Sequence, residues 1–399
     1  MPTILCVNPG SNSLKFDLVQ TQSSQSRAGE GHRILTGVID DIGKDTSLVI
    51  KRGDEQILNK KLSGGDFNAA MKAVLEALDH QDLSKPELAA VRVVHGGDSF
   101  QQAVEVDEDV LQKIEVRAEL APLHNPNAAR VIRAIQQHRM NLPIAAAFDT
   151  AFHHSVPEVA WRYPLDLEIA DRHNIRKFGF HGISHRYQLD QFCYLTGTPI
   201  EEASLITTHL ESGSSVCAIR NGKSVETSMG FTPLEGLMMG TRSGSVDPFI
   251  VPFLMKHERL SADEAIHLLE SKSGLLGISG QSLDTRVLRK NTDARSQLAL
   301  EMYAYRVRAN IGAYLAILGD AKAIVFAGGI GENTPEIRRY VLEGLHGLGV
   351  EVDAHRNEDV MTGDTLLSSP NSKTAVWVLH SDEGLQLAHE CSRIFSGTT

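Results

Sequence analysis

Two arginines stand out because the sequence places each of them in surroundings that charged side chains usually avoid. Arg92 interrupts the apolar run 89–95, which predicts a buried strand, and Arg242 lies in 239–244, a loop of small residues. A guanidinium in such a place needs a partner, and its fork of donors suits a carboxylate or a phosphate. A structural salt bridge is the alternative for Arg92. Both residues are therefore candidates for binding an anionic substrate.

Two carboxylates follow predicted strands. Asp149 ends the apolar run 143–148, and Glu383 comes after the last predicted strand, 374–379. The carboxyl ends of strands are where α/β sheets bind ligands. Either residue could instead cap the structure that follows, and Glu383 could also hold Mg²⁺ through one oxygen or a water.

Histidines gather at predicted turns, without the spacing of a zinc site. They are His95, His124, His153, His154, His181, His185 and His209.

Three turns rich in glycine or serine, 8–13, 209–215 and 328–333, each follow an apolar strand. Exposed backbone N–H groups in such turns make a nest for an anion. Neither a Walker loop nor a Rossmann fingerprint is present. The first two turns each join a hairpin, which indicates two related halves facing one ligand. Glu211 puts a negative charge in the second turn, where the anion would sit.

Strands and helices alternate along the chain, which is typical of α/β domains. The chain has 399 residues, too many for one core, so we expect two domains with a boundary near residue 150. The predicted domains are 1–150, with the terminal helix 384–399 packing back on it, and 151–383. Predicted strands are 4–8, 14–20, 33–39, 46–52, 56–61, 88–95, 143–148, 204–208, 215–221, 223–227, 322–327 and 374–379. Predicted helices are 66–80, 107–120, 127–139, 185–196, 261–271, 294–319, 335–348 and 382–395.

Composition restricts the partners. The formal net charge of −11 argues against a general binder of nucleic acid or anionic membranes. The four scattered cysteines predict buried free thiols in a reducing compartment. The sequence shows neither a signal peptide nor an apolar run long enough for a bilayer, so we expect a cytosolic protein.

The motifs taken together resemble those of the acetate kinase family of acyl-phosphate-forming kinases. The resemblance covers nearly the whole chain. It rests on Asn8-x-Gly10-Ser11-x-Ser13-Leu14-Lys15, Arg92–Gly97, Ala121–Pro126, Phe148–His153, Phe178–His185, Glu226–Gly236, Met239–Asp247, Ser273–Gly280 and Gly328–Asn333.

The resemblance implies an α/β fold of two duplicated actin/Hsp70-like (ribonuclease H-like) domains with a catalytic cleft between them. It also implies reversible phosphoryl transfer from ATP to acetate, giving acetyl phosphate and ADP by direct in-line transfer. The implied cofactor is Mg²⁺, with Mn²⁺ as an alternative, and the implied assembly is a homodimer.

Residue roles also follow from the resemblance. Arg92 and Arg242 match the arginines that hold the acyl carboxylate and the transferring phosphoryl group. Asp149 matches the essential carboxylate, His181 the histidine that stabilises the transition state, and His124 a supporting one. The pocket for the acetate methyl group matches Val94, Leu123, Phe180 and Pro233, and the magnesium positions match Asn8 and Glu383. The positions for the nucleotide and its phosphates are Ser11, Ser13, Lys15, His209, Ser212, Gly213, Asp284, Arg286, Gly329, Ile330, Gly331 and Asn333.

The chain departs from the family pattern mainly in the second turn, where Glu211 and Ser212 replace a glycine and an asparagine. Asn12, Val91 and Gly384 also differ from the pattern, and Gly384 replaces a second acidic residue. Two alternatives therefore stay open. One is a kinase for another short acid (propionate, butyrate) or for another phosphoryl donor such as pyrophosphate. The other is a weakly active protein that senses nucleotide or acyl phosphate.

Overall fold

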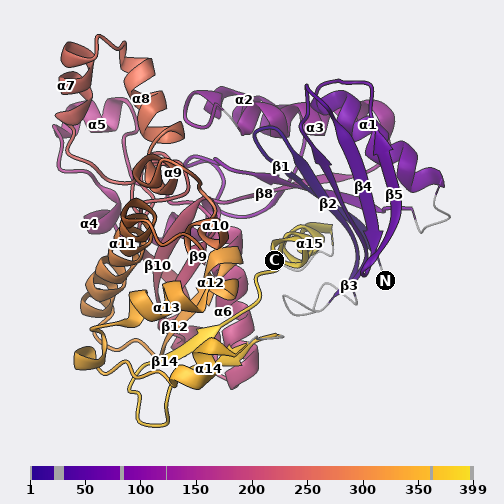
Figure 1. Ribbon diagram of the computed structural model, residues 1–399. Helices are drawn as coiled ribbons and strands as arrows, with labels where there is room; N and C mark the ends of the chain where they lie inside the picture. The colour runs from indigo at the N-terminus through magenta and orange to yellow at the C-terminus, as the bar shows by residue number, and fades with distance from the viewer. Residues whose placement is uncertain (1, 22–30, 81–84, 123, 360–362, 396–399) are drawn as a thin grey trace. The chain divides into compact units, whose positions relative to one another are not determined.

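The structure is a computed structural model that describes residues 2–21, 31–80, 85–122, 124–359 and 363–395 (Figure 1). The chain divides into two compact units. The first comprises Met1–His154, Gly182–Asp190 and Asp382–Thr399, and the second comprises Ser155–His181 and Gln191–Ser381. The predicted boundary near residue 150 lies close to the first crossing, but the predicted domains lacked the return of 182–190 to the first unit. The catalytic cleft between the two domains, which the family resemblance implies, stays a prediction.

The first unit is built on an eight-stranded sheet of order β5-β4-β3-β2-β1-β6-β8-β7. β1 pairs antiparallel with β2 and parallel with β6, and β6 pairs parallel with β8. The strands are β1 (Thr3–Pro9), β2 (Leu14–Thr21), β3 (Gly31–Asp40), β4 (Ser47–Arg52), β5 (Glu55–Lys61), β6 (Leu88–Val93), β7 (Val104–Glu105) and β8 (Ile144–Phe148).

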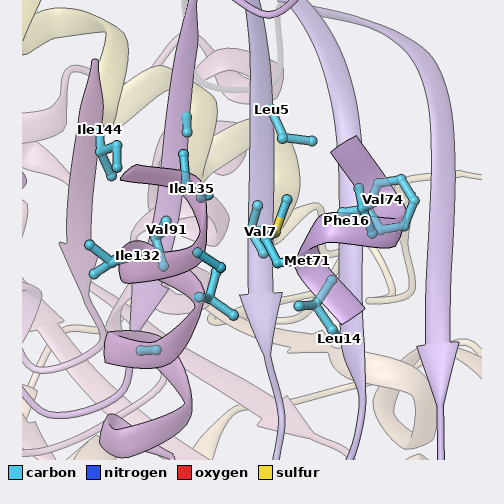
Figure 2. Packing of buried hydrophobic residues seen from close by; sticks show 14 of the residues in the cluster. Leu5, Val7, Leu14, Phe16, Met71, Val74, Val91, Ile132, Ile135 and Ile144 are labelled. Carbon is cyan, nitrogen blue, oxygen red and sulfur yellow. The ribbon is translucent and has the colours of Figure 1, made fainter. Parts of the chain in front are cut away.

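Side chains that alternate along β1 pack into two different cores, as the pleat of a strand requires. Leu5 and Val7 pack with residues of α1 (Phe67–His80) and α3 (Asn125–His138), as Figure 2 shows. Ile4 and Cys6 pack on the opposite face, with α15 (Glu383–Phe395). The sheet is therefore covered on both faces, and α15 lies against β1, β2, β6 and β8.

The second unit contains a six-stranded sheet of order β11-β10-β9-β12-β14-β13. Its strands are β9 (Leu205–Leu210), β10 (Ser214–Arg220), β11 (Lys223–Thr227), β12 (Ala323–Ala327), β13 (Thr365–Leu366) and β14 (Ala375–Val378). β9 pairs antiparallel with β10 and parallel with β12, so β11-β10-β9-β12-β14 repeats the arrangement of β3-β2-β1-β6-β8. The predicted duplication is confirmed at the level of the sheets.

Helices complete both units. Those of the first unit include α2 (Glu108–Val116), and α6 (Gly182–Thr196) begins in the first unit and continues in the second. The remaining helices are α4 (Glu158–Trp161), α5 (Leu167–Arg172), α7 (Ile250–His257), α8 (Ala262–Ser271), α9 (Gly274–Ser279), α10 (Thr285–Leu288), α11 (Ala294–Leu318), α12 (Gly328–Asn333), α13 (Pro335–Leu342) and α14 (Ala354–Glu358).

The predicted long elements are confirmed, including the cap at Asp66 and the capping box of Ser261 and Glu264. The prediction of a loop at 328–333 was wrong, because this segment forms the short helix α12. Predicted helices 107–120 and 335–348 each end in a separate 3₁₀ turn. The four cysteines are free and buried, as expected. None of the helices in the described part of the chain has the length and apolarity that a bilayer span requires.

Candidate active site

Arg92 lies at the centre of a cluster of polar side chains in the first unit. Its Nε donates to Asp149 Oδ1 at 2.8 Å and its Nη2 donates to Asp149 Oδ2 at 2.6 Å. Its Nη1 donates to Asn8 Oδ1 and to Glu383 Oε2, both at 3.2 Å. The side chain of Arg92 is 16% exposed, whereas that of Asp149 is 1% exposed. The guanidinium is thus oriented by a bidentate pair and two further acceptors.

Three neighbouring strands bring these residues together. β1, β6 and β8 are parallel, and their register pairs Val7 with Val91 and Arg92 with Ala147. Asn8 therefore lies near the carboxyl end of β1, beside Arg92, and Asp149 follows directly after β8. The location at the carboxyl ends of adjacent parallel strands is typical of ligand sites in α/β sheets.

Glu383 reaches Arg92 from the first turn of α15. The cap of this helix is Asp382, because the Leu385 N–H donates to Asp382 Oδ1 at 2.9 Å. The alternative in which Glu383 caps the last helix is therefore wrong, and its contact with Arg92 supports a role in the site.

Gly384 has a packing reason that the sequence does not reveal. A Cβ at this position would lie 2.2 Å from Asp17 Oδ2. Arg33 pairs with both Asp17 and Asp382, so the space beside Gly384 is filled by an ion-pair cluster. Burial raises the pKa of Asp17, and Arg33 lowers it again in part. A second acidic residue at position 384 would clash with this cluster.

The turn between β1 and β2 is held by hydrogen bonds. The Gly10 N–H donates to Ser13 O at 2.7 Å, and Asn127 Nδ2 of α3 donates to Gly10 O at 2.9 Å. Ser11 and Lys15 are exposed and Ser13 is half-buried. The turn therefore presents a hydroxyl group and an ammonium group from a fixed backbone, which suits an anion.

A second cluster lies in the second unit, around His181. This residue adopts a left-handed conformation, with φ of 57°, directly before α6. Its Nδ1 lies 2.9 Å from Ser215 Oγ, and its ring centroid lies 4.2 Å from that of His209. The polar contact to Ser215 and the ring contact with His209 fix the imidazole. Backbone strain of the kind seen at His181 is common at functional sites.

Arg242 comes close to the same histidine through Gly213. A Cβ on Gly213 would lie 3.4 Å from His181 Nε2 and 3.5 Å from Arg242 Nη1. Burial lowers the pKa of Arg242, while Glu270 raises it in part. Arg242 Nη1 also donates to Pro233 O at 3.4 Å. The absence of a side chain at Gly213 leaves room in front of one imidazole and one guanidinium.

The carboxylate of Glu211 lies at the glycine-rich start of α12. Its Oε1 accepts from the Gly329 N–H at 3.2 Å. The turn itself is fixed, because the Glu211 N–H donates to Gly213 O at 3.1 Å and the Gly240 N–H donates to Ser212 O at 3.0 Å. A backbone donor that a phosphate oxygen could use is thus engaged by a side chain of the chain itself.

Helix α12 is held by Glu332, which belongs to the motif Gly328–Asn333, and by Arg338, to which the sequence analysis assigned no role. Glu332 Oε1 accepts from the backbone N–H groups of Gly328 and Ser381 at 2.9 and 3.0 Å. Arg338 is buried, and its Nη1 donates to the carbonyl oxygens of Gly331 and Glu332, each at 2.8 Å. Burial lowers the pKa of Arg338 to about 10. An arginine on the predicted helix 335–348 was the one available signal.

Asp284 and Arg286 bind each other. Asp284 is the N-cap of α10, and its Oδ2 accepts from Arg286 Nη2 at 2.8 Å. Arg286 lowers the pKa of Asp284, chiefly through their side-chain hydrogen bond. The guanidinium is largely exposed and accessible to a ligand.

The other predicted site residues fall in both units. Val94 and His124 lie in the first unit, where His124 precedes α3 without a side-chain hydrogen bond to cap it. Phe180, Ile330 and Asn333 lie in the second unit, with Phe180 buried. Leu123 lies outside the described residues. Of the predicted residues, Asn8, Asp149 and Glu383 contact Arg92, whereas His209, Gly213 and Arg242 lie close to His181.

Comparisons with known proteins bear on these clusters. The Acetokinase family matches residues 3–389. The chain belongs to this family. It is 42% identical to an acetate kinase of Thermoanaerobacterium thermosaccharolyticum, over 98% of both chains, and 42% identical to one of Methanosarcina acetivorans, over 98% of this chain and 96% of the other.

Two solved structures also resemble this acetokinase family member. The acetate kinase of Porphyromonas gingivalis has a TM-score of 0.91 and 34% identity, over 99% of this chain and 100% of that one. A propionate kinase of Francisella tularensis has a TM-score of 0.90 and 35% identity, over 98% and 99%. The α/β fold of two units is therefore the fold of these kinases.

Proposed function

We propose that this acetokinase family member transfers a phosphoryl group reversibly between ATP and acetate, forming acetyl phosphate and ADP. It is thus a phosphotransferase with a carboxyl group as acceptor. Family membership supports this reaction, as does the match to acetate kinases along nearly the whole chain. The observation within the molecule that carries the proposal is the Arg92 guanidinium, oriented by Asp149 at the carboxyl ends of three strands.

Arg92 and Asp149 would act as one unit at the acid. In-line phosphoryl transfer requires positioning and positive charge on the oxygens around phosphorus, with little covalent work for the protein. The bidentate contact to Asp149 fixes the plane of the guanidinium, so Arg92 can orient a substrate carboxylate. The partial exposure of Arg92, compared with the burial of Asp149, leaves the arginine as the group that meets the substrate.

The second cluster would stabilise the transferring phosphoryl group. His181 and Arg242 both lie close to the space that Gly213 leaves without a side chain. A hydrogen-bonded imidazole and a buried guanidinium are donors that need little reorganisation during the reaction. Phe180 and Pro233 would contribute to an apolar wall for the acid.

Magnesium ion would be held by Asn8 and Glu383. Asn8 Oδ1 and Glu383 Oε2 both accept a hydrogen bond from the same cationic nitrogen, Arg92 Nη1, so the two oxygens lie close together. An amide oxygen and a carboxylate oxygen suit Mg²⁺, which commonly binds one or two protein oxygens and fills its remaining coordination positions with phosphate oxygens and water. Within the described residues, no group of three or more His, Cys, Asp or Glu side chains could hold a metal ion by itself. When bound, the ion would neutralise charge on the nucleotide phosphates.

The choice of acid stays open to another short carboxylate. A propionate kinase resembles this chain as closely as an acetate kinase does, with TM-scores of 0.90 and 0.91. One methylene group in an apolar pocket is worth only about 1–3 kcal/mol. We therefore propose acetate as the substrate and propionate as the second candidate.

A homodimer is the proposed assembly, and exposed apolar side chains of the second unit support it. Phe249 and Phe253, at the start of α7 and within it, are 72% and 51% exposed. Large apolar groups on the surface are typical of interfaces between protein chains. A cytosolic location, and the absence of nucleic acid and membrane partners, stay predictions from the sequence.

The experiment that tests the function is a matrix of phosphoryl donors and acids. The protein is mixed with Mg²⁺, hydroxylamine, one of ATP or pyrophosphate, and one of acetate, propionate or butyrate, and the acyl hydroxamate is measured. We expect the largest kcat/KM with ATP and acetate. No product in any combination would contradict the kinase function and favour a sensor.

A further inference from the structure

A cavity of about 640 Å³ lies in the first unit, on the side of the sheet that α15 covers. One stripe of α15 lines it with Gln386, Glu390 and Arg393. Phe148 and Ala151, which flank Asp149 in the chain, also line it. The cavity therefore reaches the stretch of chain that carries Asp149, and nothing in the proposed reaction uses it.

Two side chains in this cavity have a hydrogen-bonding pattern that is only half satisfied. Gln386 Nε2 donates to Glu390 Oε1 at 2.9 Å. Gln386 is only 1% exposed, and its Oε1 atom has no hydrogen-bond partner among the described residues. A buried acceptor without a donor costs free energy. If Glu390 carries a proton, a rotation of the Gln386 amide group lets the carboxyl O–H donate to that oxygen. The pair thus has one arrangement for each protonation state.

Charged groups from several elements face Glu390. Arg186 and Asp190 come from α6 and form a pair, with Arg186 Nε 3.0 and 2.9 Å from the two carboxylate oxygens. Asp149 comes from the end of β8. The remaining titratable and charged residues of the cavity are Glu105, His389 and Arg393.

These surroundings favour the protonated form. The pKa of Glu390 is raised to about 7, chiefly by burial; Gln386 and Arg186 lower it in part, and the negative charges of Asp190 and Asp149 contribute to the rise. Burial lowers the pKa of His389, so this neighbour carries little positive charge at neutral pH. The carboxyl group therefore changes its charge within the physiological range of pH.

We propose that Glu390 is a positioning residue for the Arg92–Asp149 pair, because its carboxyl group exchanges a proton through the cavity and thereby changes the field at Asp149. This inference rests on the catalytic role proposed for that pair. When Glu390 is ionised, its charge adds to that of Asp149 and opposes an anionic substrate at Arg92. When Glu390 is protonated, the opposition is removed. The coupling between the two carboxylates is reciprocal, as linkage requires.

The test is the pH dependence of the KM for acetate, measured separately from kcat between pH 6 and pH 8.5. The wild-type KM should rise by about threefold with an inflection near pH 7, the size of effect expected from one screened charge. Glu390→Gln should keep the low value throughout. Gln386→Leu removes the donor to the ionised carboxylate, so it should move the inflection to higher pH.

Glu105→Gln is the matched control, because Glu105 is an exposed carboxylate on the same cavity. It should keep the wild-type profile. An inflection that persists in Glu390→Gln, or one that Gln386→Leu leaves in place, overturns the inference. Asp149→Asn tests the proposed function separately: an active Asp149→Asn variant contradicts the role of the pair, whatever the profile of Glu390→Gln.

Discussion

The two hairpin turns, 8–13 and 209–215, join equivalent strands in the part of the arrangement that the two sheets share, yet they carry different chemistry. The strand before the first turn supplies Asn8, which contacts a guanidinium. The strand before the second supplies His209, whose ring lies against that of His181. The duplicated scaffold therefore places one side chain at the same topological point in both units, and the residue type decides what is bound.

The tips of the two turns differ as well. The first is held from outside by Asn127 and has a cationic neighbour in Lys15. The second places the Glu211 carboxylate against the Gly329 N–H. One turn is thus prepared for an anion, whereas the other already contains one. The comparison indicates that the departure from the family pattern is concentrated in the second turn, at Glu211 and Ser212.

The largest expected effect comes from removing the cation of either cluster. Arg92→Ala and Arg242→Ala should each lower kcat by about 100- to 1,000-fold, because each removes a preoriented donor to the reacting groups. Steady-state kinetics of acetyl phosphate formation measure this. Arg133→Ala, which removes a surface pair between Arg133 of α3 and Glu115 of α2, is the control and should leave kcat within about twofold. A mild effect at Arg92 or Arg242 would contradict the role in the reaction that is proposed for that arginine.

Sequence alone predicted most of what the backbone pattern determines. The hairpins, the buried strands and the duplication follow from apolar alternation and turn residues, and Arg92 was recognisable because a cation in an apolar strand needs a partner. The partner itself was beyond sequence, since Asp149 and Glu383 reach Arg92 only through parallel strand pairing and the return of α15.

Other features could not be predicted because they depend on tertiary packing. Gly384 is explained only by the Asp17–Arg33 pair, whose members lie on β2 and β3, whereas the glycine lies on α15. The Glu211 contact to Gly329 joins residues that are far apart in sequence. The short helices, including α12, carry too few residues for a periodic signal.

The support of α12 in the second unit provides the next prediction. Arg338→Met should lower the free energy of unfolding by about 3 kcal/mol, because it leaves Gly331 O, Glu332 O and the Asn357 side chain without their buried donor. Urea denaturation measures the loss. Arg339→Met, on the same helix, is the control and should change the free energy by less than about 1 kcal/mol. Equal effects at both positions would show that Arg338 does not support the turn.

Replacing Glu211 and Ser212 should make the second turn chemically more similar to the first, because both would then lack an anionic side chain at the tip. Glu211→Gly combined with Ser212→Asn should raise kcat/KM for ATP by about tenfold, because it removes a carboxylate from a backbone donor and adds an amide. The single variant Glu211→Gln keeps the size of the side chain and separates charge from shape. An unchanged or lower kcat/KM for ATP, with activity towards pyrophosphate kept, would mean that the turn is adapted to another donor.

The smallest expected effect concerns the packing of α15 beside the first hairpin. Gly384→Ala should lower the free energy of unfolding by about 1 kcal/mol, because the new Cβ would lie 2.2 Å from Asp17 Oδ2 and would displace that carboxylate from Arg33. Gly312→Ala is the matched control in α11, where an added Cβ meets no atom within 4 Å. It should instead raise the free energy of unfolding by about 0.5–1 kcal/mol through helix propensity. Since both variants are Gly→Ala changes in helices, opposite signs would isolate the contact with Asp17, and a gain at position 384 would contradict it.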